Sequence, residues 1–198
     1  MMVLFRWLGL GIGLAGVACW PPSLAQAGAT AAIEAAPLPP GSTQVAASAD
    51  ECAVWQRELG FAASVAAHDA RAFASYLHPG AIFDAGAGDA PRGVAAVSES
   101  WSEIVAGTAI ALRWRPGIVQ IGEPNVAVSK GPYILQSTRS GTASYQVGFY
   151  QTVWIRGGSG GPWRVLYDAL ASTPMPMASR EAADAWVGAQ AMSACAGS

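Results

Sequence analysis

The spacing of apolar residues changes once along the chain, from the period of a helix to that of a strand. Before Gly107, Trp55, Leu59, Ala62 and Ala66 recur every three or four positions, which is the pattern of a helix with one buried face. After Gly107 the sequence consists of extended segments separated by turns. Because the helices come first and the strands follow, we predict an α+β domain with helices packed on one face of a curved antiparallel sheet.

The expected elements run from residue 50 to residue 192. The first half predicts two helices, a short strand and a third helix, at residues 50–68, 69–76, 81–84 and 92–106. The second half predicts four strands, at residues 108–121, 126–138, 142–156 and 163–171. Pro132 indicates an edge or irregular position, because proline cannot donate to a sheet ladder. Residues 173–176 are expected to end the sheet, and a final helix is expected at 179–192.

The first 27 residues have the three-part pattern of a secretory signal peptide. Arg6 is the only charged residue before Glu34, and an apolar run follows it at residues 8–18. This run is too short to span a bilayer, which takes about 20 apolar residues, but it suits the core of a signal peptide. Residues 24–27 offer a cleavage site with small side chains. We therefore expect an exported protein, either periplasmic or secreted.

A second interpretation of the N-terminus is a lipoprotein signal in which Cys19 is lipidated. Gly16 stands where such signals usually carry leucine, which counts against it. Membrane attachment is expected only in that case. Residues 28–48 have almost no large apolar side chains, so we expect a disordered linker there. Residues 49–173 then form the folded domain, and residues 174–198 form a C-terminal helix and tail.

Removal of the signal peptide would leave two cysteines, Cys52 and Cys195, one near each end of the folded part. In an oxidising compartment such a pair is expected to form a disulfide. The bridge would close a loop of about 143 residues and stabilise the fold by up to ~5 kcal/mol in the chain-entropy model. The alternative is two unpaired thiols, because a sequence does not give their separation.

Charge and motif content exclude several classes of partner. The formal net charge is −2, and basic residues are not clustered, which argues against nucleic acid and against anionic lipid. His68 and His78 are ten residues apart with no cysteine or histidine cluster around them, so we expect no metal site. Residues 86–88 lack the third glycine of a dinucleotide-binding motif, so we expect no nucleotide cofactor. Residues 157–161 match G-x-S-x-G, but they join two strands and no histidine follows, so we predict a hairpin loop.

The order of elements, helix–helix–strand–helix and then a four-stranded meander, resembles the nuclear transport factor-like superfamily. Local motifs at residues 66–69, 82–84, 93–101, 131–133, 148–154 and 163–168 sharpen this resemblance. The last two are similar to the closing hairpin of its ketosteroid isomerase-like and polyketide cyclase-like branch. The resemblance implies a conical pocket between the helices and the concave face of the sheet. It also implies a homodimer formed through the outer face of the sheet.

The catalytic residues of ketosteroid isomerases are not reproduced in an ungapped match. Their tyrosine on the first helix corresponds to Phe61, which has no hydroxyl group. Their general base after the first strand corresponds to Ala85. Asp84 lies one residue earlier and so, in a strand, on the opposite face. A shift of one residue would restore Asp84 to the position of the base.

Asp84 and Asp168 are the candidate catalytic carboxylates. Both fall in predicted strands within apolar stretches, where an unpaired carboxylate is costly. One interpretation places them in the pocket, with pKa values raised by burial, as a general base or a ligand anchor. The other is an ion pair with Arg139, Arg156 or Arg164, or exposure at the end of a strand.

Large aromatic side chains could line a pocket for a flat apolar molecule. The candidates are Phe61, Trp101, Trp114, Tyr133, Phe149 and Trp154. The alternative is ordinary packing in the core or in a dimer interface, which large aromatics also dominate.

Two functions therefore follow from the sequence. The first is a non-catalytic binding or assembly module with an aromatic-lined pocket for a small apolar ligand. The second is an isomerase, cyclase or dehydratase with Asp84 or Asp168 as general base and Tyr133 or Tyr150 as hydrogen-bond donor.

Overall fold

The computed structural model describes residues 42–84, 88–158 and 160–195. The helices are α1 (Ala49–Ala66), α2 (Ala70–Tyr76), α3 (Gly93–Ser100), α4 (Ser102–Ala106) and α5 (Arg180–Gly188). The strands are β1 (Ser42–Ala46), β2 (Leu77–Phe83), β3 (Ile110–Trp114), β4 (Ile118–Glu123), β5 (Val126–Ser137), β6 (Ser144–Ile155), β7 (Arg164–Leu170), β8 (Met175–Met177) and β9 (Ala191–Ala194). The fold is α+β, as predicted.

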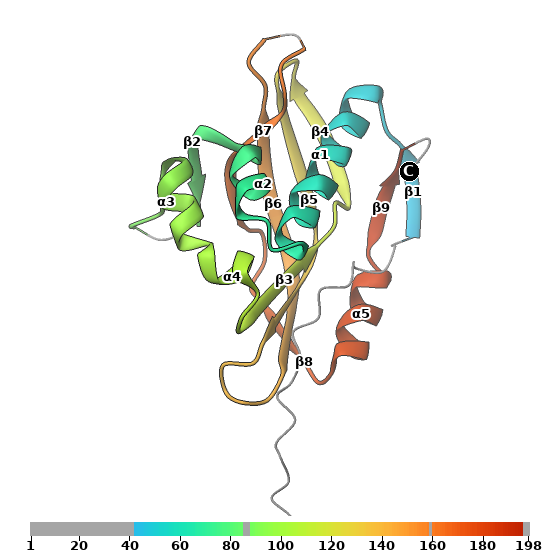
Figure 1. Ribbon diagram of the computed structural model, residues 1–198. Helices are drawn as coiled ribbons and strands as arrows, with labels where there is room; N and C mark the ends of the chain where they lie inside the picture. The colour runs from blue at the N-terminus through green and yellow to red at the C-terminus, as the bar shows by residue number, and fades with distance from the viewer. Residues whose placement is uncertain (1–41, 85–87, 159, 196–198) are drawn as a thin grey trace, which may run out of the picture.

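The main sheet is strongly curled and mostly antiparallel. The strand order is β2-β7-β6-β5-β3. In addition, β4 pairs with β5 and β8 pairs with β6. Only β2 and β7 pair in parallel within this sheet. The long strands β5 and β6 form its centre, and α1 and α2 lie in front of them in Figure 1. The concave face of the sheet is therefore covered by helices.

Local capping fixes where the first two helices begin. Ser48 caps α1 in a capping box, because its side chain accepts from the N–H of Glu51 while the Glu51 side chain accepts from the N–H of Ser48. Asp69 caps α2 by accepting from Ala72 N–H at 2.8 Å. Each cap satisfies a backbone N–H group that the first turn of its helix would otherwise leave unpaired.

An aromatic cluster joins these helices to the concave face. The ring of Phe61 on α1 lies with its centroid 5.3 Å from Phe73 on α2 and from Trp114 on β3. Its centroid lies 6.1 Å from that of Trp154 on β6. All four side chains are buried. Contacts of this size and geometry contribute much of the stability of a core.

The sheet differs in detail from the expectation. The predicted strand 108–121 is two strands, β3 and β4, which pair in succession with β5. Pro132 lies in a central strand and not at an edge, but its position is irregular, as the alternative prediction had it, because it lies opposite the break between β3 and β4. Its carbonyl accepts from Arg115 N–H, so its ring nitrogen faces the break between β3 and β4, where no ladder donor is required. The predicted third helix also divides, into α3 and α4, at Trp101.

The ends of the chain carry more strand than expected. Residues 42–46, predicted as part of a disordered linker, form β1, which pairs in parallel with β9. Residues 175–177, where the sheet was expected to end, add β8 to β6. The final helix ends at Gly188 rather than at residue 192. The predicted signal peptide lies outside the described residues.

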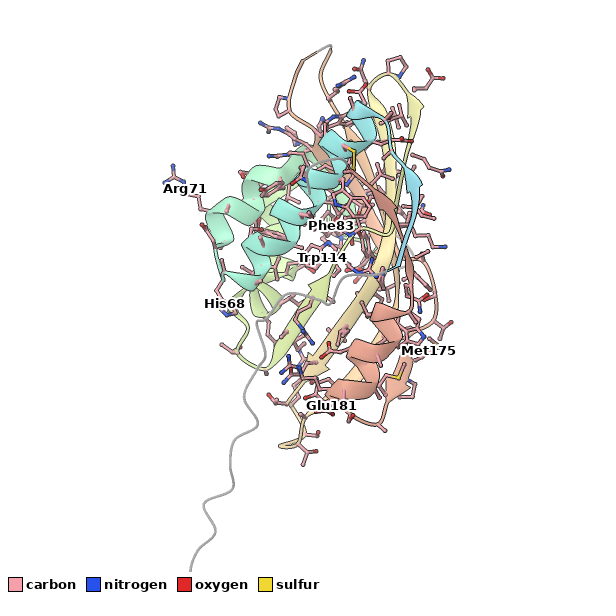
Figure 2. The ribbon with its side chains drawn as sticks, turned by 90° about the vertical axis from the view of Figure 1, so that its right-hand side faces the viewer. His68, Arg71, Phe83, Trp114, Met175 and Glu181 are labelled. Atoms are coloured by element: carbon pink, nitrogen blue, oxygen red, sulfur yellow. A yellow bond between two sulfur atoms is a disulfide. The ribbon has the colours of Figure 1, made fainter. Side chains whose placement is uncertain are left out.

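The C-terminal segment covers part of the outer face of the sheet. Ala183 and Val187 of α5 are buried against Ile134 and Val147 of the central strands. Arg115 donates to the Val187 and Gln190 carbonyl oxygens at 2.9 and 3.1 Å and so caps the end of α5. Figure 2 shows α5 at the lower end of the sheet, beside Met175 of β8.

A disulfide joins the two ends of the domain. Cys52 on α1 is bonded to Cys195, directly after β9, with the Cα atoms 5.5 Å apart. This confirms the pairing expected from the sequence. Among the described residues, no helix is long and apolar enough to span a membrane.

Candidate functional site

A pocket of about 150 Å³ lies between the concave face of the sheet and α4. It is lined by side chains from five strands or strand ends and from the α3–α4 region. The lining residues are Asp84, Trp101, Ile104, Leu112, Trp114, Tyr133, Leu135, Tyr150, Asp168 and Leu170. Leu112 and Trp114, like Tyr133 and Leu135, are two positions apart in one strand, so each pair projects from the same face.

Asp168 on β7 is the deeper of the two carboxyl groups in the lining. Thr152 Oγ1 on the neighbouring strand donates to its Oδ2 at 2.7 Å. Burial of the carboxyl group is the largest cause that raises its pKa to about 8; the Thr152 hydrogen bond opposes this shift, and the nearby Glu58 and Asp84 carboxyl groups contribute to it. Asp168 is therefore largely protonated at neutral pH and can donate as well as accept a hydrogen bond.

Asp84 lies at the mouth of the pocket, where it is exposed to solvent on one side. It follows β2 and has a φ of 54°, a left-handed conformation that aspartate tolerates better than most residues. Its N–H donates to the Asp168 carbonyl oxygen at 2.9 Å. Partial burial raises the pKa of the Asp84 carboxyl group. Because this backbone conformation ends the strand, simple alternation does not predict the side chain's direction.

Glu58 on α1 is a buried carboxylate that the sequence analysis did not single out. It is fully buried and accepts from the indole N–H groups of Trp114 and Trp154, each at 2.7 Å. Burial raises its pKa to about 7, while the bonds from Trp114, Trp154 and Ser129 oppose that shift. Trp114 lines the pocket, so Glu58 holds one wall of the pocket from behind.

Tyr150 connects Glu58 with the pocket. Its hydroxyl lies 3.3 Å from Ser129 Oγ, and Ser129 also hydrogen-bonds to Glu58. Burial, together with the Glu58 and Asp168 carboxyl groups, raises the pKa of Tyr150 well above its ordinary value. Tyr150 is therefore a neutral phenol whose hydroxyl is already engaged within the protein.

Tyr133 has the opposite character. It is 3% exposed, and its hydroxyl has no hydrogen-bond partner among the described residues. Tyr133 on β5 pairs with Gly148 on β6. A Cβ atom added to Gly148 would lie 2.8 Å from the Tyr133 hydroxyl oxygen. A buried polar atom without a partner costs stability, so a hydrogen bond made to this hydroxyl group would be favourable.

Comparison with known proteins finds similarity in structure but not in sequence. No protein-family model matches the chain, and no curated protein matches it significantly. A ketosteroid isomerase-like protein from Erwinia carotovora atroseptica superposes with a TM-score of 0.53 at 9% identity, covering 64% of this chain and 100% of the other. A provisionally named scytalone dehydratase from Novosphingobium aromaticivorans gives 0.54 at 10% identity, covering 72% and 92%.

A nuclear transport factor 2-like superfamily protein from Salmonella enterica gives a TM-score of 0.50 at 16% identity, covering 66% of this chain and 95% of the other. The domain has the nuclear transport factor-like fold. At these identities the likeness defines the fold and not the activity.

The nuclear transport factor-like domain brings six of the residues singled out from the sequence to one pocket. They are Asp84, Trp101, Trp114, Tyr133, Tyr150 and Asp168. Phe61 and Trp154 lie behind the pocket wall in the core. Phe149 lies on the outer face, with its ring centroid 5.3 Å from that of Trp186 on α5.

Two of the three arginines considered as partners for the carboxyl groups, Arg139 and Arg156, are engaged elsewhere. Arg139 forms an exposed ion pair with Glu103, and Arg156 pairs with Asp50 at 3.2 Å. No ion pair of Asp84 or Asp168 occurs among the described contacts. Within the same residues, no group of three or more His, Cys, Asp or Glu side chains could hold a metal ion.

Proposed function

We propose that this protein binds a small, largely apolar molecule in the pocket of its nuclear transport factor-like domain. The observation that carries the proposal is the lining itself, which combines four aromatic and four aliphatic side chains with very few polar groups. Small-molecule sites have this composition, in which apolar walls give affinity and a few polar atoms fix orientation.

The Tyr133 hydroxyl supplies one such orienting group. It is buried and has no partner within the described part of the chain, so a ligand that carries an oxygen or nitrogen atom would satisfy it. The bound molecule would therefore be apolar over most of its surface, with a single polar group directed at Tyr133.

A thermal-shift screen of small aromatic and aliphatic compounds tests this proposal. We expect some compounds to raise the melting temperature of the wild-type protein, because a ligand that binds only the folded state stabilises it. Leu112→Trp fills the pocket and should abolish that shift. Ile118→Trp is the matched control, because Ile118 is 49% exposed and lies outside the pocket lining. A shift that survives Leu112→Trp, or the absence of any shift, would overturn the proposal.

A second function, proton transfer by an isomerase, cyclase or dehydratase, is favoured by one specific observation. Asp84 and Asp168 line the same pocket as Tyr133, and burial raises the pKa values of both carboxyl groups. Asp84 would take a proton from a carbon next to a carbonyl group. Asp168, with its pKa of about 8, and Tyr133 would donate hydrogen bonds to the carbonyl oxygen. The names of two structural neighbours belong to this reaction class.

Deuterium exchange separates the enzyme from the binding module. The protein is incubated with cyclic ketones in D₂O, and loss of the α-proton signals is followed by NMR. An enzyme accelerates this exchange, and Asp84→Asn removes the acceleration, whereas Asp89→Asn, an exposed carboxylate nearby, leaves it intact. If the wild-type rate equals that of buffer, the proton-transfer function fails and the binding function stands.

Export and dimerisation are part of the same proposal. Export would give the oxidising compartment that suits the Cys52–Cys195 bridge, and N-terminal sequencing of secreted material tests it. A homodimer would use the outer face of the sheet that α5 leaves uncovered, and light scattering of the purified protein gives its mass directly.

A further inference from the structure

The charges of the pocket are all of one sign. Two of its lining residues, Asp84 and Asp168, carry carboxyl groups, and no lysine, arginine or histidine is among the described lining residues. Residues 85–87, which follow Asp84, are Ala-Gly-Ala and bring no charge of either sign. The pocket therefore disfavours an anionic ligand and offers no internal cation to its acids.

A third acid stands directly behind the pocket. Glu58 and Asp84 both act on Asp168 and raise the pKa of its carboxyl group. Hydrogen bonds from Trp114, Trp154 and Ser129 stabilise Glu58, whereas Thr152 donates a side-chain hydrogen bond to Asp168. Buried acids are normally paired with a cation or held neutral. A positively charged ligand would stabilise the ionised forms of these three groups.

The aromatic part of the lining is also suited to a cation. Four rings belong to it, those of Trp101, Trp114, Tyr133 and Tyr150. The Trp114 centroid lies 6.3 Å from that of Trp101 and 6.4 Å from that of Tyr150. The Trp114 indole N–H donates a hydrogen bond to Glu58, and the Tyr150 hydroxyl group is hydrogen-bonded to Ser129. These two residues therefore contribute ring surface, the negative face of which attracts cations.

We propose that the pocket takes a small organic cation, an apolar amine or quaternary ammonium compound whose charge lies beside Asp84 and Asp168 and whose hydrocarbon part contacts the aromatic rings. The inference rests on the proposed binding function and names its ligand class. The buried Tyr133 hydroxyl, which has no partner among the described residues, can accept an N–H bond from a primary or secondary amine.

Binding of a cation is coupled to ionisation of these carboxyl groups. The charged and titratable groups that act on Asp168 are Glu58 from α1 and Asp84 after β2. Tyr150 from β6 lies near Asp168 and Glu58. With the pKa of Asp168 at about 8, a cation that binds its ionised form at pH 6 must displace a proton. The affinity for a permanent cation should therefore rise between pH 6 and pH 9, by at most about tenfold per pH unit for each carboxyl group.

Isothermal titration with two molecules of the same shape provides the test. Phenyltrimethylammonium carries a permanent charge, tert-butylbenzene is its neutral isostere, and benzoate serves as an anion. We expect the cation to bind at least tenfold more tightly than its isostere at pH 8, with benzoate weakest. Asp168→Asn and Asp84→Asn should each reduce cation affinity about tenfold or more and leave the isostere unaffected, whereas the exposed Asp89→Asn should change neither.

The outcomes separate this inference from the binding function. If the neutral isostere or benzoate binds as tightly as the cation, the cation inference is wrong and the pocket still binds small molecules. If none of the three compounds binds, both proposals fail. Should Asp168→Asn not fold, Asp84→Asn alone decides, because Asp84 lies at the solvent-exposed mouth.

Discussion

Three carboxyl groups determine the chemistry of this domain at the scale of single residues. Glu58, Asp84 and Asp168 come from α1, from the end of β2 and from β7. Burial is the largest cause of the raised pKa in each case. An acid with a raised pKa holds its proton more tightly in the folded chain than in the unfolded chain. The folded protein consequently binds more protons than the unfolded one over the range between the two pKa values.

This difference predicts the direction of the pH dependence of stability. The pKa values of Glu58 and Asp168 are raised from 4.5 to about 7 and from 3.8 to about 8. The free energy of unfolding should thus fall as the pH rises from about 4 to about 8, because the folded state must then give up protons that the unfolded state has already lost. Urea denaturation at a series of pH values measures this slope, and Asp168→Asn should flatten it. A slope that the variant leaves unchanged would contradict the pKa assigned to Asp168.

The sequence pointed to some of these residues and not to others. Asp84 and Asp168 were recognised because a carboxylate in an apolar strand is unusual, and Tyr133 and Tyr150 were recognised as possible hydrogen-bond donors. Glu58 was missed because the predicted helical stripe was displaced by one residue. The buried face of α1 includes Val54, Glu58, Phe61 and Val65. A glutamate at the spacing of the buried apolar residues was the signal that could have identified Glu58.

Cross-strand pairs act at the scale of the elements, and Tyr133, which lines the pocket, packs closely against Gly148 on the neighbouring strand. Gly148→Ala would place a Cβ atom 2.8 Å from the Tyr133 hydroxyl and 3.0 Å from Ser172 Oγ. We expect a loss of about 1–3 kcal/mol in the free energy of unfolding, the usual cost of overpacking. Gly188→Ala is the matched control, because a Cβ atom there meets nothing within 4 Å. Equal stability of the two variants in urea denaturation would contradict the close contact.

Long-range pairing explains which elements the sequence did not predict. The helices and central strands follow local periodicity and caps, and most of them lie close to their expected bounds. The strand β1 depends on β9, at the far end of the chain, and β8 depends on β6. Such short segments have little intrinsic preference of their own, so only the assembled fold makes them strands.

The disulfide is the feature that acts on the whole molecule. It ties α1 to the segment after β9 across a sequence separation of 143 residues. The variant Cys52→Ser with Cys195→Ser should lose up to about 5 kcal/mol of stability in the chain-entropy model. Denaturation of the wild-type protein with a reductant should give the same loss. If neither treatment lowers the denaturation midpoint, the bridge does not contribute to stability.

The pocket beside Trp101 and Trp114 is the ligand site in both proposals. Indole N–H signals in a ¹⁵N-resolved NMR spectrum report on it directly, because each tryptophan gives its own peak. On titration with phenyltrimethylammonium, we expect the Trp101 and Trp114 peaks to move, while that of Trp186, on the outer face, stays in place. Movement of the Trp186 peak alone, or of no peak at saturating ligand, would contradict it.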